Sequence, residues 1–142
     1  LHLCDRRQRQ MCIRDRPKNA MTTQAGSGYP VGQCTWYAYN RLIELNLIAP
    51  VGYGFLGNGQ DWTRSLVAKG WKYVSKPEKG AVLSIQGGVD GTVAAYGHVA
   101  IVEHVNPDGT FLLSECNWLG VQNKIHYRVV SMKSGYSFAV KK

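Results

Sequence analysis

The spacing of apolar residues changes once along this chain, and that change limits the folds open to it. Up to Gly70 the apolar side chains recur at the three- and four-residue intervals of helices, which predicts helices over residues 34–47 and 60–68. Beyond Gly70 the interval falls to two, which predicts strands over residues 71–75, 81–86, 98–105, 111–117, 124–131 and 135–140. Helices followed by strands indicate an α+β fold, with N-terminal helices packed on an antiparallel sheet of about six strands.

Length and composition fit one globular domain. The chain has 142 residues, of which 44% are hydrophobic and 18% are charged, so it can bury a substantial core. No apolar run approaches the roughly 20 residues of a transmembrane helix, and we expect no membrane insertion. We expect the domain to be a monomer.

The first twenty residues differ from the rest. Six basic side chains stand there against two aspartates, giving a net charge of +4 out of the total of +8, with no apolar periodicity and no apolar segment typical of a secretory signal. We expect residues 1–20 to be a disordered basic arm that is artefactual or non-native, because Met11–Arg16 resembles a translated sequencing adaptor. Residues 21–28 would be a linker and residues 29–142 the domain. The alternative is an arm that binds nucleic acid or an anionic membrane. No aromatic residues interleave its arginines, and we expect no nucleic-acid partner.

Cys34 lies where a polar, glycine-marked approach meets the first predicted helix. The first turn of a helix has unpaired N–H groups and the positive end of the helix dipole, both of which favour a thiolate. Because the thiolate is the reactive form of cysteine, this position makes Cys34 a candidate nucleophile. The alternative is a buried structural thiol.

A predicted hairpin carries the side chains that could act with this thiol. His98 opens its first strand, residues 106–110 give a strong turn signal, and Glu115 and Asn117 lie on its second strand. His98 lies 8 residues before Asn106 and Asn117 lies 7 after Thr110, so we expect these side chains to meet. Glu115 and Asn117 alternate in phase and should share one face of the sheet. Covalent cysteine catalysis requires a histidine and a carboxylate or amide that orients it.

The other cysteines give a weaker signal. Four are present, but Cys4 and Cys12 lie in the basic arm and Cys116 alternates toward the core, so we expect no disulfides. The sequence contains no Cys-x-x-Cys or His-x-x-x-His pair, and we expect no zinc site.

Several short motifs resemble the CHAP domain family of cysteine- and histidine-dependent amidohydrolases and peptidases. The resemblance covers roughly residues 29–140. The matching segments are residues 32–36 (Gly-Gln-Cys-Thr-Trp), 57–62 (Gly-Asn-Gly-Gln-Asp-Trp), 96–100 (Tyr-Gly-His-Val-Ala) and 114–117 (Ser-Glu-Cys-Asn), with Pro77 and residues 80–82 (Gly-Ala-Val). The resemblance implies a papain-like fold related to the NlpC/P60 peptidases. It also implies hydrolysis of an amide bond in bacterial peptidoglycan, as an endopeptidase or an N-acetylmuramoyl-L-alanine amidase, through a cysteine acyl-enzyme.

The same resemblance assigns roles to individual residues. Cys34 would be the nucleophile and His98 the base, with either Glu115 or Asn117 orienting His98. Gln33 would lie near the oxyanion site together with the backbone N–H of Cys34. Candidate substrate contacts are Asn58, Trp62, Tyr96 and Trp118; for Trp62 the alternative is packing in the core.

The resemblance also bears on cofactors and on the place of action. Some phage-derived members bind calcium through an acidic loop just before the cysteine motif, but residues 22–28 contain no carboxylate, so we expect no calcium and no other cofactor. The expected partner is peptidoglycan, reached by a secreted or phage-delivered protein. Alternatives are a toxin or small-amide amidase with the same chemistry, or a non-catalytic cell-wall-binding or phage tail module.

Overall fold

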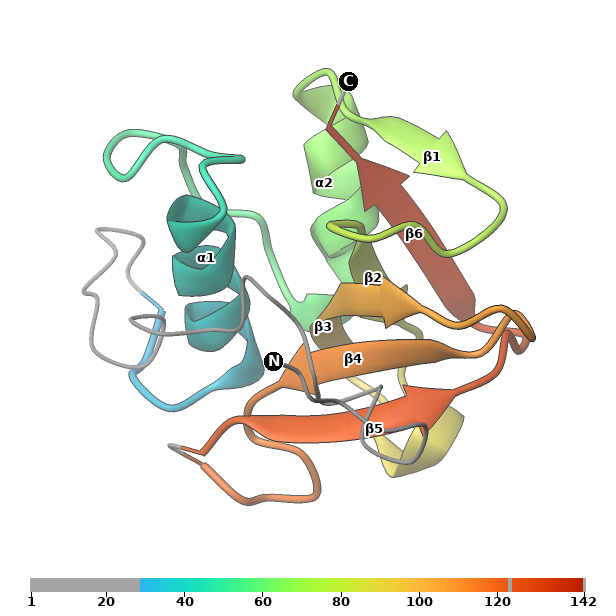
Figure 1. The fold of residues 1–142 in the computed structure, drawn as a ribbon. Helices are drawn as coiled ribbons and strands as arrows, with labels where there is room; N and C mark the ends of the chain where they lie inside the picture. Colours follow the sequence, from blue (N-terminus) through green and yellow to red (C-terminus); the bar gives the residue numbers. More distant parts are fainter. Residues whose placement is uncertain (1–28, 123, 142) are drawn as a thin grey trace, which may run out of the picture.

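The computed structural model describes residues 29–122 and 124–141, and in them two α-helices precede a six-stranded antiparallel sheet (Figure 1). The helical elements are α1 (Cys34–Glu44), the 3₁₀ helix η2 (Gly59–Asp61), α2 (Trp62–Ala68) and the 3₁₀ helix η3 (Val89–Gly91). The strands are β1 (Lys72–Val74), β2 (Val82–Ile85), β3 (His98–Val105), β4 (Phe111–Glu115), β5 (His126–Val130) and β6 (Tyr136–Val140). The α+β class and all six predicted strands are confirmed, whereas η3 was not predicted.

The strands lie in the order β1-β6-β2-β3-β4-β5. Strands β2 to β5 follow one another as neighbours, with β3 and β4 forming the predicted hairpin. The last strand, β6, lies between β1 and β2. The alternation of side chains does not encode this insertion, because it sets the faces of a strand and not its neighbours.

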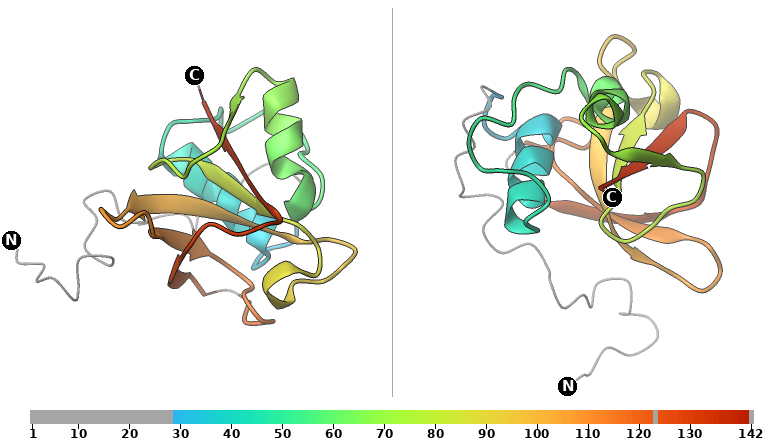
Figure 2. Two further views of the ribbon diagram at one scale, coloured as in Figure 1. Left: turned by 90° about the vertical axis from the view of Figure 1, so that its right-hand side faces the viewer. Right: turned by 90° about the horizontal axis from the view of Figure 1, so that it is seen from above.

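Both helices cover one face of the sheet (Figure 2). Helix α1 packs on β3 and β4, and α2 packs on β1, β2 and β6. The core between helices and sheet is built from fully buried side chains of both layers, among them Tyr37, Leu42, Leu66, Val99 and Ile101. Burial of these apolar side chains fixes α1, and with it the start of that helix, against the central strands.

The other face of the sheet is concave, and side chains of its non-adjacent strands meet across it. Phe111 of β4 lies with its ring centroid 5.4 Å from that of Phe138 and 6.4 Å from that of Tyr136, both on β6. Two strands separate β4 from β6 in the sheet, so these contacts require strong curvature. A second buried cluster fills the concave side, which explains why β2 is buried on both faces.

Two predicted elements end earlier than expected. Helix α1 ends at Glu44 and not at residue 47, because Asn46 adopts φ +61°. The N–H groups of Asn46 and Leu47 then donate to the carbonyls of Ile43 and Leu42, each at 2.9 Å, which is a Schellman motif with asparagine in the left-handed position. Strand β4 ends at Glu115 and not at residue 117.

A buried ion pair joins α1 to the sheet. Arg41 donates through Nε and Nη2 to the two carboxylate oxygens of Glu103 on β3, at 2.9 and 2.8 Å. The hydroxyl of Ser114 donates to the same carboxylate at 2.6 Å and accepts from Tyr37 at 2.7 Å. Because the planar guanidinium fits a carboxylate at two points, this pair fixes the rotation of α1 as well as its distance.

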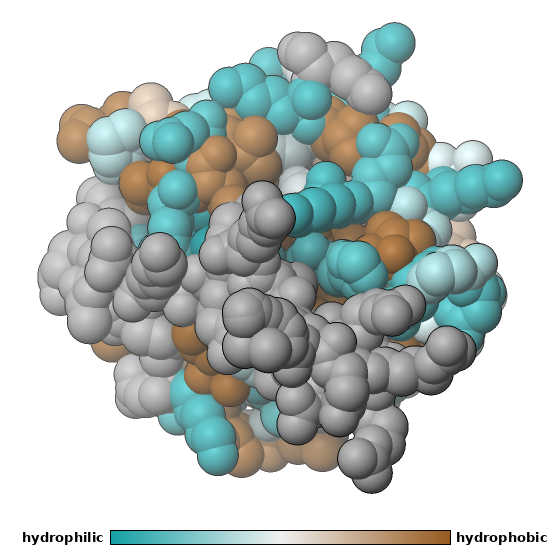
Figure 3. All heavy atoms as spheres, in the orientation of Figure 1, coloured by the Kyte–Doolittle hydropathy of each residue, from teal (hydrophilic) through white to brown (hydrophobic). Residues whose placement is uncertain are grey.

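The surface is mixed in character. On the part of the face in Figure 3 where described residues show, hydrophilic and hydrophobic side chains are interspersed. None of the helices in the described ranges is both long and apolar enough to cross a bilayer. The predicted arm and linker, residues 1–28, lie outside the described residues.

Candidate active site

A cleft of about 650 Å³ opens at the start of α1. Four segments line it: the turn and first residues of α1, the loop before η2, the segment from η3 to β3, and the residues after β4. The lining residues are Tyr29, Pro30, Gln33, Cys34, Thr35, Phe55, Gly57, Asn58, Gly59, Gly91, Thr92, Val93, Tyr96, Gly97, His98, Asn117, Trp118, Leu119 and Gly120. The cleft therefore contains the predicted cysteine and histidine.

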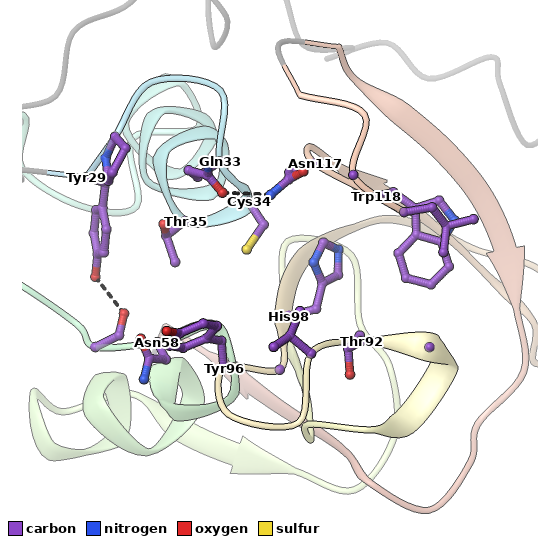
Figure 4. A pocket seen from close by; sticks show the side chains of 18 of the residues that line it. Tyr29, Gln33, Cys34, Thr35, Asn58, Thr92, Tyr96, His98, Asn117 and Trp118 are labelled. Atoms are coloured by element: carbon purple, nitrogen blue, oxygen red, sulfur yellow. Dashed lines mark hydrogen bonds between the residues drawn. The ribbon is translucent and has the colours of Figure 1, made fainter.

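Cys34 is the first residue of α1, as predicted. Gln33 precedes it in extended conformation, and no side chain caps the helix. The first helical hydrogen bond runs from the Tyr37 N–H to the Gln33 carbonyl, at 3.1 Å. The half-buried Cys34 carries a free thiol, and its sulfur lies in the cleft beside the imidazole of His98 (Figure 4). The unpaired N–H groups of the first turn of α1 therefore point toward the cleft.

The backbone of His98 is held by the loop that leads into η2. A Cβ atom on Gly59 would lie 2.6 Å from the His98 carbonyl carbon, and one on Gly97 would lie 2.5 Å from Cβ of Gln60. Gln60 binds the chain before β3: its N–H donates to the Tyr96 carbonyl at 3.0 Å, and its side-chain amide donates to the Ala95 carbonyl at 2.9 Å. Gly59 at the start of η2 and Gly97 just before β3 allow this close approach, which places the imidazole.

Glu115 is the residue that contacts the imidazole of His98. The Nε2 atom of His98 lies 2.9 Å from Oε1 of Glu115, and both side chains are buried. This leaves the other ring nitrogen, Nδ1, for Cys34. Burial by itself would lower the pKa of His98, but its interactions with Cys34 and Glu115 outweigh burial and raise the pKa to about 9. The arrangement therefore favours an imidazolium beside the sulfur.

The second oxygen of Glu115 has partners on β5. Oε2 accepts a hydrogen bond from Nε of Arg128 at 2.6 Å and lies 3.1 Å from Nδ1 of His126. Burial would raise the pKa of Glu115, but its contacts with His98 and Arg128 hold that pKa below its usual range. The carboxylate thus stays charged inside the protein.

Asn117 lies elsewhere than predicted. It follows the end of β4 with φ +55°, so the alternation that predicted a face shared with Glu115 does not extend to it. Its Nδ2 donates to Oε1 of Gln33 at 2.6 Å. Asn117 is therefore bonded to the residue before the cysteine, whereas Glu115 contacts the histidine.

The predicted substrate contacts divide into two groups. Tyr96, Trp118 and Asn58 line the cleft. Trp62 does not: its exposed fraction is 0%, and it packs against Tyr29 and Tyr39 in the core. The prediction that Trp62 contacts substrate is wrong, because its side chain is fully buried against these two tyrosines and does not reach the cleft.

Sequence reasoning missed the residues behind Glu115. Arg128 also donates to Asp90, and His126 lies directly opposite Glu115 in the ladder between β4 and β5. No motif marks these positions. The sequence does place Arg128 and His126 on one face of a predicted strand. That they lie beside Glu115 follows only once the register of β5 with β4 is known.

Cys116 is buried, and its thiol donates to the Gly32 carbonyl at 3.1 Å. No group of three or more potential metal-binding His, Cys, Asp or Glu side chains occurs within residues 29–122 and 124–141.

Comparisons with known proteins find sequences similar to this chain. The family model described as the CHAP domain matches residues 24–117. An N-acetylmuramoyl-L-alanine amidase domain-containing protein of Staphylococcus aureus is 37% identical over 66% of this chain and 14% of its own length. The N-acetylmuramoyl-L-alanine amidase sle1 of Staphylococcus epidermidis is 34% identical over 72% of this chain and 29% of its own.

A structural comparison gives a similar result. The crystal structure of an N-acetylmuramoyl-L-alanine amidase from Staphylococcus aureus superposes with a TM-score of 0.71 and 31% identity, over 84% of this chain and 33% of that one. The chain thus spans about a third or less of the lengths of these relatives.

Proposed function

This chain belongs to the CHAP domain family, and on that basis we propose that it hydrolyses an amide bond of bacterial peptidoglycan through an acyl-enzyme on Cys34. The observation that carries the proposal is that Cys34 and His98 line one cleft, with the buried carboxylate of Glu115 2.9 Å from the far side of the imidazole. A thiol, a histidine and an orienting carboxylate are the parts that nucleophilic cysteine catalysis requires.

In the acylation step, the Cys34 thiolate attacks the carbonyl carbon and forms a carbon–sulfur bond. The tetrahedral intermediate then collapses, the carbon–nitrogen bond breaks, and the imidazolium of His98 gives its proton to the leaving amine. The product is a thioester on Cys34. The raised pKa of His98, about 9, keeps the proton available for this transfer at neutral pH.

In the deacylation step, neutral His98 takes a proton from water while the oxygen attacks the thioester carbonyl. The carbon–sulfur bond breaks, the acid product leaves, and the thiolate–imidazolium pair returns. Glu115 stabilises the imidazolium in both steps and keeps Nδ1 directed at the sulfur.

The negative charge that develops on the carbonyl oxygen needs donors nearby. We assign this role to the backbone N–H of Cys34, at the uncapped start of α1, and to the side-chain amide of Gln33. Because the Oε1 atom of Gln33 accepts from Asn117, the NH₂ group of Gln33 is left as the donor. Asn117 is therefore the residue that orients Gln33.

The lining of the cleft suits an uncharged part of the substrate that resembles a peptide backbone. Among the described lining residues none is Asp, Glu, Lys or Arg, while Tyr96 and Trp118 offer aromatic surfaces. The names of the relatives favour the amide between muramyl lactate and L-alanine as the bond cut. We place this activity at the cell wall, outside the membrane, with the chain acting as a monomer.

Mass spectrometry of digested walls tests the proposal. Purified peptidoglycan is incubated with the chain or with Cys34→Ala, and the soluble products are sequenced by fragmentation. We expect new L-alanine N-termini and free muramyl lactate with the unmodified chain alone. New termini within or between stem peptides would mean an endopeptidase, and no release by either protein would refute the proposed function.

A further inference from the structure

Arg128 lies directly behind the carboxylate that contacts His98. Its Nε donates to Oε2 of Glu115 at 2.6 Å, while Oε1 of the same carboxylate lies 2.9 Å from Nε2 of His98. The side chain of Glu115 is 0% exposed and that of Arg128 is 15% exposed. The terminal torsion of a glutamate has a broad energy profile, so a buried carboxylate keeps one rotation only if both oxygens are held. Arg128 donates to the oxygen that His98 does not contact, and it lies closer to that oxygen than Nδ1 of His126, which is 3.1 Å away.

Arg128 is itself fixed from two directions. Its Nη1 donates to Oδ2 of Asp90 in η3 at 3.2 Å, and Asp90 also accepts from Lys133 and from the hydroxyl of Tyr136. Its guanidinium lies 3.7 Å from the ring centroid of Trp118, a residue of the cleft wall. Arg128 thus connects the carboxylate with η3 and with the surface that meets substrate.

The sheet register sets this arrangement. Glu115 pairs with His126 and Leu113 pairs with Arg128, so Arg128 is the diagonal neighbour of Glu115 on the same face. A guanidinium can donate from Nε and Nη1 in different directions while its flat face stacks on an aromatic ring. A lysine ammonium has the same charge but not this geometry.

We propose that Arg128 is a positioning residue for the reaction: it holds the Glu115 carboxylate in the rotation that presents Oε1 to His98, and it ties that rotation to the Trp118 wall of the cleft. This inference rests on the proposed function for its effect on turnover. Its effect on the imidazole can be measured without any substrate.

Two rival roles for Arg128 make different predictions. The titratable groups that face His98 are Cys34 and Glu115. Glu115 is in turn in contact with His126 and Arg128. Arg128 contacts Asp90, which also binds Lys133 and Tyr136. As a bare positive charge, Arg128 would disfavour the imidazolium, and its removal would raise the pKa of His98. As a positioning residue, its removal frees Glu115 to rotate and lowers that pKa. A purely structural role would change only the melting temperature.

The test uses Arg128→Met and Arg128→Lys in the full chain. Nuclear magnetic resonance follows the Cε1–H signal of His98 through a titration across neutral and alkaline pH. We expect both variants to move the midpoint below that of the unmodified chain, measured alongside them. With a soluble muropeptide, the turnover number should fall about tenfold or more, with a smaller change in KM.

Two controls separate positioning from general damage. Arg64→Met removes an exposed arginine that pairs with Asp61, and it should change neither the midpoint nor turnover. Val130→Ala weakens packing of β5 and should lower the melting temperature without moving the midpoint. A midpoint that stays or rises in Arg128→Met would overturn the proposal. An unmodified chain that cleaves no wall would refute the proposed function, while the titration would still decide the role of Arg128.

Discussion

At the scale of single residues, the structure gives Glu115 and Asn117 different partners. Glu115 contacts Nε2 of His98 and carries a full charge, so it can stabilise an imidazolium. Asn117 contacts Gln33 and adds no charge. Substitution of Glu115 should therefore change the pH dependence of the reaction, whereas substitution of Asn117 should change the rate alone.

Glu115→Gln should shift the alkaline limb of the pH–rate profile to lower pH. The imidazolium of His98 must survive to protonate the leaving amine, and its pKa is raised to about 9 partly through Glu115. Activity of the unmodified chain should therefore fall above about pH 9. Without the carboxylate that pKa falls and activity is lost at lower pH, with the maximal rate reduced by several powers of ten. A profile with the same alkaline limb as the unmodified chain would contradict this role.

Asn117→Ala should lower the rate and leave the pH profile in place. The variant lacks the hydrogen bond to Gln33, so the side-chain amide of Gln33 is no longer held in the orientation in which it donates to the developing oxyanion. Loss of such a donor reduces turnover by about a hundredfold or more, and loss of its orientation should cost about tenfold to a hundredfold. The turnover number with a soluble muropeptide is the measurement. If Asn117→Ala shifts the alkaline limb as Glu115→Gln does, Asn117 acts on His98 after all.

At the scale of elements, the site depends on the approach of η2 to the start of β3. Gly59 touches the backbone of His98, and the Ser84 hydroxyl donates to the Gly59 carbonyl at 2.8 Å. The same hydroxyl accepts from the N–H of Thr63 at 3.1 Å. The loop before α2 is therefore part of the support for the imidazole, although it contributes no catalytic group.

Gly59→Ala should displace His98 and lower both activity and melting temperature. The added Cβ would lie 2.6 Å from the His98 carbonyl carbon, closer than packed atoms allow, and neither side is a flexible side chain. Gly109→Ala is the control. Gly109 has φ +90°, so an alanine there strains the backbone and lowers stability, but the added Cβ would meet no atom within 4 Å. The control should lose about 1 to 2 kcal/mol of stability and keep its turnover number. Equal loss of turnover in both variants would show that stability alone is responsible.

The sequence predicted the elements better than their arrangement. Periodicity located all six strands, and the turn at residues 106–110 correctly brought His98 and Glu115 together. It placed Asn117 wrongly, because a positive φ ends the alternation at that point. Arg128 and Asp90 were missed since their contact depends on the pairing of β5 with β4 and on the turn at η3. Such pairings are set by packing between distant segments, which local patterns do not record.

At the scale of the whole molecule, the described residues form two buried clusters joined through one curved sheet. One cluster supports α1 and the cysteine, and the other lies on the concave face. The cleft lies at the start of α1, so relative movement of helix and sheet would separate Cys34 from His98. The stability of the domain and its activity should therefore be lost together on heating.

Removal of residues 1–20 should leave the melting temperature and the turnover number with a soluble muropeptide unchanged. The segment lacks apolar periodicity, so we expect it to contribute little to burial. Its net charge of +4 should matter only for attraction to an anionic wall, as a stronger dependence of lysis on salt in the full chain. A fall of several degrees in melting temperature on truncation would show that the segment is part of the domain.

The most direct measurement is lysis of purified cell walls by Cys34→Ala beside the unmodified chain, with folding checked by circular dichroism. We expect the unmodified chain to clear the suspension, while the variant keeps its fold and melting temperature and clears none. Iodoacetamide should label Cys34 faster than the buried Cys116 and abolish lysis in step with the labelling. Clearing by a folded Cys34→Ala variant would contradict the account, because no other described residue occupies the position of the nucleophile.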